Sequence, residues 1–488
     1  MNRLIPILFF VFLGIKLALC TSISIYAPAY KNQPITWGKK IDYITNLSEI
    51  IADDIIDSNG YVKLYFNFNQ NELTEISIGR SHSMLYVDTS NYEYNLYFPK
   101  DTLIDKASLK KSELQIVFLN LEINNINSLI LDFNNQLDYF LYGDTNKIIR
   151  MAKHSQEFQD SLNSFKILLS DRYKTKKIKY LHNYIRYEIA ILEQLAYQNK
   201  GDYFKAYMYE NYLKRNEVNY KNDAYMQFFN LFYRDVFEIG GIEINDRIKF
   251  SINNYNELKK LIEIIQSCKY FSSPQISELA IIKGLFEAYK YPAYSSENIL
   301  SFLKKIALES KWQEHKTLAS NCINELTKFT IGYTCPELFV VDQNNEKIKI
   351  HDLRGKYTYI NFFATWNYKS LHEMEIIKQF KENYSFINYF SVNLDYNEDE
   401  YMNFIKSNLN YQWPITYPLN KQKIVDDFQL DHLPSHLLID PDGNISQFPA
   451  LPPSPLSKGY NSTTIDKTFF TIKKNNGVKE SFKIGKKN

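Results

Sequence analysis

The spacing of the apolar residues changes twice along this chain of 488 residues, and it limits the folds that the chain can adopt. Between residues 22 and 121 apolar residues tend to alternate with polar ones, as in Tyr61-Val-Lys-Leu-Tyr-Phe66, and this alternation predicts β-strands. Between residues 123 and 328 the spacing is close to about 3.6 residues, which predicts amphipathic helices. From Ile331 short apolar runs alternate with helical segments, a pattern typical of an α/β layer.

These three patterns predict a multidomain α+β protein. The N-terminal domain, residues 21–122, is expected to be β-sandwich-like, and the central domain, residues 123–330, is expected to be all-α. The C-terminal domain, residues 331–474, is expected to be an α/β/α layer. Residues 1–20 are set apart as an export signal and residues 475–488 as a basic tail.

Individual elements can be placed from the same spacing. Strands are expected at residues 61–68, 75–78, 84–87, 92–98 and 114–119. Helices are expected around residues 126–140 and 185–195, and at Thr145–Tyr173, Asp202–Lys214, Ala224–Phe237, Glu257–Ser267, Gln275–Lys290 and Glu297–Leu326. Within the central domain proline occurs only as Pro274 and Pro292, both between expected helices, as suits a residue that breaks helices.

The charged residues nearly cancel, since 57 Lys and Arg stand against 55 Asp and Glu and leave a net charge of +2. A dedicated nucleic-acid-binding protein needs a strongly basic face, so this balance argues against a nucleic-acid partner. The sequence contains no P-loop, no dinucleotide-binding glycine pattern, no GxSxG elbow and no HExxH motif. No cofactor is therefore expected.

The first 20 residues have the pattern of an export signal. Arg3 supplies a positive charge, residues 4–15 are mostly apolar, and Ala18-Leu19-Cys20 offers small residues for cleavage. The apolar stretch is shorter than the roughly 20 residues that cross a bilayer. Cys20 is either the last residue of the signal or the first residue of a lipoprotein, in which case a lipid on its sulfur would attach the chain to a membrane.

The exported chain would keep three further cysteines, Cys268, Cys322 and Cys335. Their spacings fit no CxxC or zinc-ligand pattern. One disulfide with one free thiol is compatible with this count, and so are three buried unpaired thiols, since free cysteine often packs as a small hydrophobic residue.

Landmarks in the last third of the chain carry a family resemblance. A Gly355-Lys356 turn precedes an apolar strand that ends in Phe-Phe-Ala-Thr-Trp366, and Tyr389-Phe-Ser-Val-Asn-Leu-Asp395 reads as a second buried strand. Leu433-Pro434 and the turn Pro441-Asp-Gly443 follow in order. Residues 331–472 resemble the thioredoxin-like disulfide reductases of the TlpA/ResA type, within the redoxin superfamily of the bacterial envelope. The resemblance implies a thioredoxin-like C-terminal domain and an exported location, in the periplasm or at the membrane.

The chain departs from that family at the reactive motif. Where the family has Trp-Cys-x-x-Cys, this chain has Trp366-Asn-Tyr-Lys-Ser370, so Asn367 and Ser370 replace both cysteines. Thiol–disulfide exchange needs an attacking thiolate and a second thiol to resolve the mixed disulfide. An amide has no such proton to lose, and no general base is evident beside Ser370. We therefore predict that the domain has lost its redox chemistry, and we assign no catalytic residue.

Other residues match the family without carrying chemistry by themselves. Pro434 matches the cis-proline, so that Trp366 and Pro434 either form a shallow peptide groove or persist only because the fold needs them. Glu373 matches the acidic residue of the active-site helix, and without a thiol it is expected to be a solvated charge or a charge at the helix N-terminus.

No metal site is predicted at the end of the domain that carries the motif, although three histidines fall there. His372, His432 and His436 all fall near the expected motif. The last two flank the turn proline, so their spacing does not place them on one helix face.

Three functions remain open. The favoured one is a redox-inactive protein of the cell envelope that binds or scaffolds an unknown protein or peptide partner. The second is a thiol–disulfide oxidoreductase that uses Cys322 or Cys335 in place of the motif. The third is a chaperone-like peptide-binding module built on the cis-proline groove.

Overall fold

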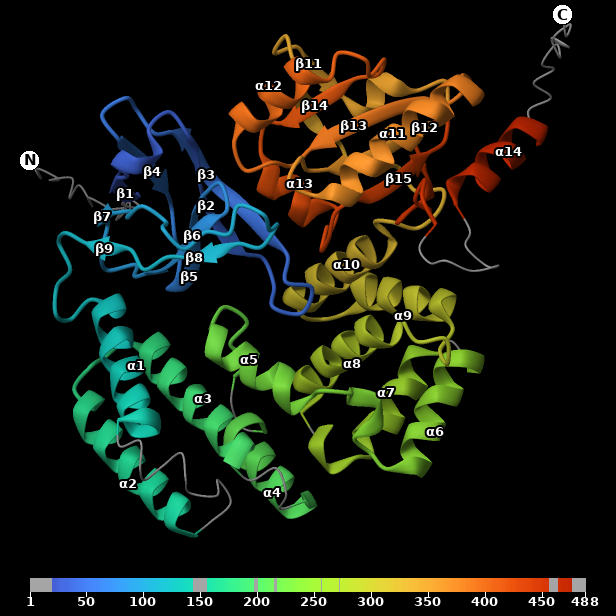
Figure 1. The fold of residues 1–488 in the computed structure, drawn as a ribbon. Coiled ribbons are helices and arrows are strands. Elements are labelled where there is room, and N and C mark those ends of the chain that lie inside the picture. Colours follow the sequence, from blue (N-terminus) through green and yellow to red (C-terminus); the bar gives the residue numbers. More distant parts are fainter. Residues whose placement is uncertain are drawn as a thin grey trace, which may run out of the picture.

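The computed structural model describes residues 20–143, 156–196, 201–214, 217–255, 257–271, 273–455 and 464–475. Strands come first, a run of helices follows, and a second sheet with its own helices ends the chain (Figure 1). The chain therefore mixes helices and sheets. The export signal before Cys20 and the basic tail after Asn475 lie outside the described residues.

Two sheets share one core in the first part of the chain. One has the strand order β4-β1-β7-β9 and the other the order β3-β2-β5-β6-β8. Trp37 from one sheet and Tyr94 from the other are buried in the same cluster, and every second residue of β5 and β6 is buried. The strands are β1 (Thr21–Tyr26), β2 (Pro34–Lys40), β3 (Ser48–Ile55), β4 (Tyr61–Phe66), β5 (Glu72–Ile78), β6 (Ser81–Val87), β7 (Glu93–Tyr97), β8 (Ser112–Glu113) and β9 (Val117–Phe118).

The helices of the middle part bury one continuous apolar core, which runs from Ile126 to Cys322. They are α1 (Ile126–Tyr142), α2 (Gln156–Tyr173), α3 (Lys179–Ala196), α4 (Gly201–Met208), α5 (Asp223–Phe232), α6 (Ile242–Phe250), α7 (Leu258–Gln266), α8 (Pro274–Ala288), α9 (Ser296–Glu309) and α10 (Gln313–Thr327). The expected start of a helix at Thr145 lies outside the described residues.

Two expectations for this part were wrong, and one helix was not expected. The helix expected at Glu297–Leu326 is two helices, because the backbone at Ser310 is extended and α10 folds back against α9. The helix expected at Ala224–Phe237 ends at Phe232, and Asp235 has a positive φ of 51°. Helix α6 was not expected, since apolar and charged residues follow one another without a clear period and Ile248 is its buried residue.

The C-terminal sheet has the order β11-β10-β14-β13-β12-β15-β16. Strands β12 and β13 are parallel, and β15 and β16 form an antiparallel hairpin at Gly443. The strands are β10 (Phe339–Val341), β11 (Lys347–Lys349), β12 (Thr358–Phe363), β13 (Asn388–Asn393), β14 (Ile415–Pro418), β15 (Ser435–Ile439) and β16 (Ile445–Gln447), and the helices are α11 (Tyr368–Asn383), α12 (Glu398–Ser407), α13 (Lys421–Asp427) and α14 (Ile465–Asn475).

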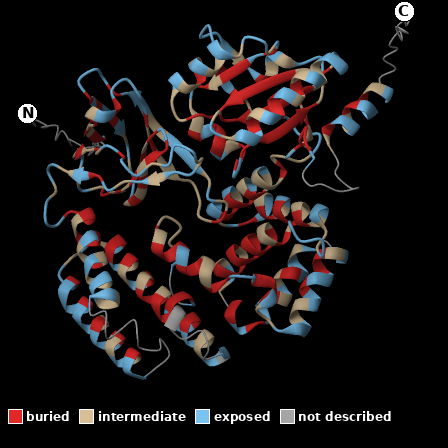
Figure 2. Cartoon of the chain, in the orientation of Figure 1, coloured by how far each residue is buried: buried red, intermediate tan, exposed pale blue. Residues whose placement is uncertain are grey.

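Helices cover both faces of this sheet, so its central strands are buried throughout (Figure 2). Ile360 and Phe362 of β12 pack with residues of α13, whereas Tyr359 and Phe363 pack with residues of α11 and α14. A strand that is apolar on both faces gives a continuous hydrophobic run, and this explains why β12 can be recognised in the sequence.

The first sheet pair is joined to the helices through the tip of the β2–β3 hairpin. Ile44 lies in the helical core, and the Asn230 side chain donates to the Tyr43 carbonyl at 2.8 Å. The Asn321 side chain donates to an oxygen of Asp42 at 2.9 Å. The hairpin tip therefore has apolar and polar partners on the helices.

The same sheet pair also contacts the C-terminal part. The guanidinium of Arg80 lies 4.8 Å and the ammonium of Lys106 lies 5.7 Å from the centre of the Tyr396 ring, which follows β13. The Lys111 ammonium lies 3.2 Å from a carboxylate oxygen of Asp426. Among the described helices, none is long and apolar enough to span a membrane.

Candidate functional site

The motif that resembles Trp-Cys-x-x-Cys lies where β12 ends and α11 begins. All six residues of β12 are buried, so the chain leaves the core only at the end of the strand. The backbone N–H of Thr365 donates to Asp395 Oδ1 at 2.7 Å, which ties this loop to the end of β13. Trp366 then reaches the surface, with 38% of its area exposed. More than a third of the Trp366 surface is therefore in contact with solvent.

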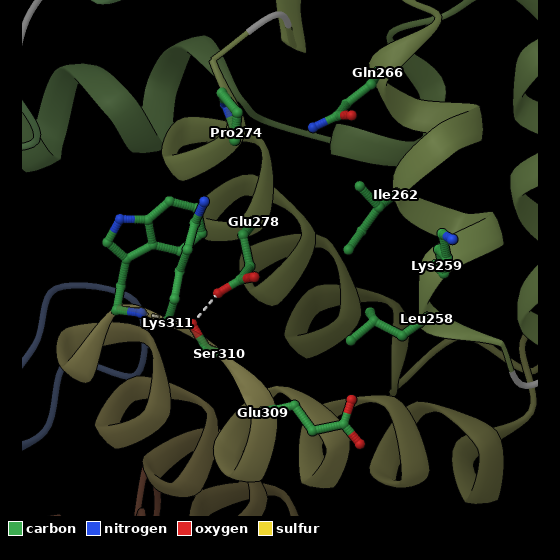
Figure 3. A pocket seen from close by; sticks show the side chains of 10 residues that line it. Leu258, Lys259, Ile262, Gln266, Pro274, Glu278, Glu309, Ser310 and Lys311 are labelled. Carbon is green, nitrogen blue, oxygen red and sulfur yellow. Dashed lines mark hydrogen bonds between the residues drawn. The ribbon is translucent and has the colours of Figure 1, made fainter.

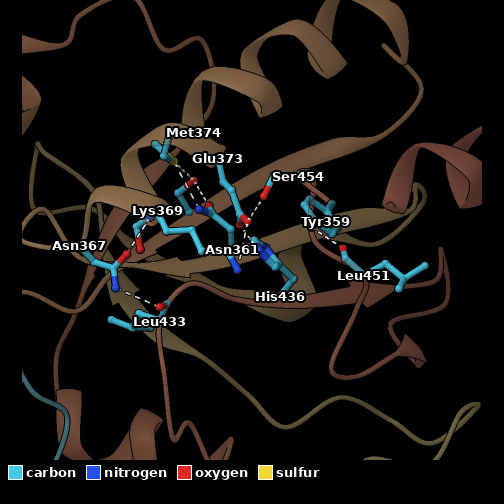
Figure 4. A network of polar contacts seen from close by, with 12 residues as sticks. Tyr359, Asn361, Asn367, Lys369, Glu373, Met374, Leu433, His436, Leu451 and Ser454 are labelled. Atoms are coloured by element: carbon cyan, nitrogen blue, oxygen red, sulfur yellow. Dashed lines mark hydrogen bonds and ion pairs between the residues drawn. The ribbon is translucent and has the colours of Figure 1, made fainter. Parts of the chain in front are cut away.

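Asn367 joins the helix to the loop that carries the matched proline (Figure 4). Its side-chain oxygen accepts from the backbone N–H of Ser370 at 2.9 Å and caps α11. Its side-chain nitrogen donates to the Leu433 carbonyl at 3.0 Å. The Leu433–Pro434 peptide bond is cis. One amide thus connects the two sides of the expected groove.

Ser370 occupies the position of the second family cysteine and is fully buried. Its hydroxyl oxygen has no hydrogen-bond partner among the described residues. A serine nucleophile needs a neighbouring base within hydrogen-bond distance, and none contacts Ser370 there. The structure therefore gives this hydroxyl no means of activation.

Glu373 was expected to be solvated or to serve as a helix N-terminal charge, and this expectation was wrong. The residue is fully buried, one turn along α11 from Ser370. Ser454 donates its hydroxyl to Glu373 Oε1 at 2.6 Å, and His436 Nε2 lies 2.7 Å from Glu373 Oε2. Both carboxylate oxygens therefore have partners, as a buried carboxylate requires.

His436 completes this buried cluster from β15. Its ring stacks on Tyr359 with 5.3 Å between the centres and 8° between the planes. Tyr359 donates its hydroxyl to the Leu451 carbonyl at 2.8 Å, and burial together with the Glu373 charge raises the Tyr359 pKa well above its usual value. This role of His436 was not expected, although the residue lies on a strand whose residues are all buried.

The other two histidines near the motif, His372 and His432, are exposed and do not share the buried environment of His436. Within the described part of the chain, no three His, Cys, Asp or Glu side chains are grouped so that they could hold a metal ion. His436 instead pairs with a carboxylate, in an arrangement where the acid lies between a hydroxyl and an imidazole. This order differs from a catalytic triad, in which the imidazole lies between the other two groups.

Comparison with known proteins identifies the fold of the C-terminal domain. A family model described as thioredoxin-like matches residues 355–445. The C-terminal domain is thioredoxin-like. It is similar to the thiol-disulfide oxidoreductase ResA of Bacillus cereus, with 29% identity over 134 residues, which cover 26% of this chain and 75% of the relative. The ResA protein of Bacillus subtilis is 27% identical over 118 residues, which cover 23% of this chain and 64% of the relative.

Among solved structures, a putative thiol-disulfide oxidoreductase from Bacteroides vulgatus is similar to the same domain. The match covers 30% of this chain and 99% of the other, with 20% sequence identity and a TM-score of 0.27. The family match lies within the thioredoxin-like domain.

The four cysteines of the chain are all unpaired, and three of them are buried. Cys335 lies in the core of the thioredoxin-like domain and Cys322 in the helical core. Burial, and to a smaller extent the charge of Glu337, raises the pKa of Cys335 to about 12. Burial, with a smaller effect of Asp42, raises the pKa of Cys322 well above its usual value. Both thiols are therefore poor sources of the thiolate that disulfide exchange needs.

We expect one fast-reacting thiol in a native chain that retains Cys20, because Cys20 alone among the four is exposed. Titration with Ellman's reagent should give about one reactive thiol per native chain and all four in denaturant. A Cys20→Ser variant is the control and should show no fast thiol. Rapid reaction of Cys322 or Cys335 in the native chain would contradict this prediction.

Proposed function

We propose that this chain is an exported protein of the cell envelope whose thioredoxin-like domain is redox-inactive and acts in binding or scaffolding. Asn367 carries the proposal. Its amide stands in place of the first thiol and holds both the helix start and the Leu433 carbonyl. A thiolate could accept the hydrogen bond at the helix start but could not donate one to the Leu433 carbonyl, so Asn367 has a structural role that a reactive thiolate could fill only in part.

The layout of the chain supports a scaffold. In this proposal residues 21–122 form a β-sandwich-like domain, residues 123–330 an all-α domain and residues 331–474 the thioredoxin-like domain. Polar and cation–π contacts join the first domain to the other two, through Asn230 and Asn321 on the helical side and Tyr396 on the thioredoxin-like side. The N-terminal signal pattern and the resemblance to the TlpA/ResA type support export, with lipid attachment at Cys20 as the form that would hold the chain at a membrane.

Two other functions are less well supported. The similar ResA proteins are named as thiol-disulfide oxidoreductases, but in this chain such an activity would depend on buried thiols with raised pKa values. A peptide-binding groove has the exposed Trp366 on one side. However, a client strand would compete with Asn367 for the Leu433 carbonyl.

Insulin reduction in the presence of dithiothreitol tests the proposal directly. We expect the purified chain to precipitate insulin no faster than dithiothreitol alone, because neither residue of the motif can form a mixed disulfide. The Cys322→Ser and Cys335→Ser variants should behave in the same way. Turnover by the unmodified chain that is lost in either variant would refute redox inactivity and establish the oxidoreductase alternative.

A further inference from the structure

The helical part contains a hollow that does not belong to the thioredoxin-like site. It has a volume of about 370 Å³ and lies between α7 on one side and the start of α8 and the α9–α10 connection on the other (Figure 3). Its walls are apolar, and its outer polar residues are charged. The apolar walls are formed by Leu258, Ile262, Pro274 and Trp312. The charged residues are Lys259, Glu309 and Lys311, and Gln266, Glu278 and Ser310 complete the lining.

Glu278 is the polar group that the fold holds most firmly in this hollow. Its side chain is 12% exposed, and Glu278 Oε1 accepts from the Ser310 hydroxyl and from His315 Nδ1, the latter at 2.8 Å. No hydrogen bond to Glu278 Oε2 is found among the described residues. Half of this carboxylate therefore has no hydrogen-bond partner among the described residues, and Oε2 is not one of the atoms that are closed off from solvent, so a ligand in the hollow can reach it.

A second layer of hydrogen bonds fixes the orientation of Glu278. His315 is fully buried, and its Nε2 lies 2.7 Å from the Tyr220 hydroxyl oxygen, within hydrogen-bond distance. The Gln275 side chain in turn donates to Tyr220 at 3.1 Å. These contacts place the imidazole between the Tyr220 hydroxyl and the Glu278 carboxylate. The imidazole therefore serves to hold Glu278, and the carboxylate is the group presented to the hollow.

The charges around Glu278 indicate a ligand that carries a positive charge at one end and a negative charge at the other. Lys259 and Lys311 line the hollow and are exposed, whereas Glu278 is mostly buried. The Lys311 ammonium lies 4.6 Å from the centre of the Trp312 ring. A ligand ammonium would give Glu278 Oε2 the partner it lacks, and a ligand carboxylate would face the two lysines. Apolar side chains would contact Leu258 and Ile262.

We propose that this hollow binds a short apolar peptide through its free N-terminal ammonium group, with Glu278 as the anchoring residue. The volume suits a ligand of two or three residues and lies in the range of small-molecule sites. The proposal does not depend on the function of the thioredoxin-like domain, because no residue of that domain lines the hollow.

Calorimetric titration of the full chain with the dipeptide Leu-Leu tests this site. N-acetyl-Leu-Leu lacks the ammonium, and Leu-Leu amide lacks the carboxylate. We expect saturable binding of Leu-Leu, a loss of affinity of about tenfold or more for the acetylated dipeptide, and a smaller loss for the amide, because the lysines are exposed and screened by solvent.

The Glu278→Gln variant should weaken Leu-Leu binding by about tenfold or more, whereas Glu309→Gln, at the exposed edge of the same hollow, should change it little. Since Glu278 also holds Ser310 and His315, the acetylated dipeptide provides a test that needs no variant. No saturable binding of Leu-Leu, or equal binding of Leu-Leu and its acetylated form, would overturn the proposal.

Discussion

Replacement of two side chains, Asn367→Cys together with Ser370→Cys, is expected to give this chain a thiol–disulfide exchange activity that, in our proposal, the unmodified chain lacks. Residue 367 is the N-cap of the 16-residue helix α11, and residue 370 lies one turn further along it. Backbone N–H groups and the helix dipole would stabilise a thiolate at position 367, with a pKa of about 7 or below. Insulin reduction should therefore rise clearly above the rate with dithiothreitol alone.

Each single cysteine variant is a control for this experiment. Asn367→Cys alone can attack a disulfide but has no second thiol to resolve it, so it should accumulate mixed disulfides without turnover. Ser370→Cys alone should be inactive, because the residue at position 370 is fully buried. If the double variant forms its disulfide and still fails to reduce insulin, the loss of activity in this domain involves more than the two motif residues.

Loss of the Glu373 carboxylate is expected to be the most damaging single change to the stability of the thioredoxin-like domain. Glu373→Ala would leave the His436 ring and the Ser454 hydroxyl buried without their partner. Breaking a buried pair of this kind costs about 3–5 kcal/mol. Hydrogen exchange followed by mass spectrometry should show faster exchange in β12 and β15, by about a hundredfold or more.

Glu375 offers a matched control on the same helix. It is exposed and accepts a hydrogen bond of 2.6 Å from Tyr411, so Glu375→Ala should cost less than about 1 kcal/mol. The Glu373→Gln variant keeps the shape and one acceptor and should fall between the two. Equal exchange in the Glu373→Ala and Glu375→Ala variants would show that the buried cluster contributes little to stability.

The sequence was most informative where one local rule decides the structure. Strand β12 is apolar on both faces, and the turn at Gly443 has a positive φ of 89°, so both could be placed without tertiary information. The sequence was least informative where distant contacts decide. At the break between α9 and α10, the Ser310 hydroxyl donates to Glu278 on another helix, a contact that the apolar spacing of the sequence does not reveal.

The sequence by itself determined that a thioredoxin-like domain ends this chain and that its motif holds an amide and an alcohol in place of two thiols. The first statement rests on the resemblance of ordered landmarks to the TlpA/ResA type, and the second rests on the side chains at the motif positions. Only the tertiary structure decided that Asn367 binds the Leu433 carbonyl, that Glu373 is buried against His436, and that Glu278 faces a hollow with one oxygen unpaired. Each of these three features involves residues that are far apart in the sequence. The burial of those residues depends on how separate elements pack against one another.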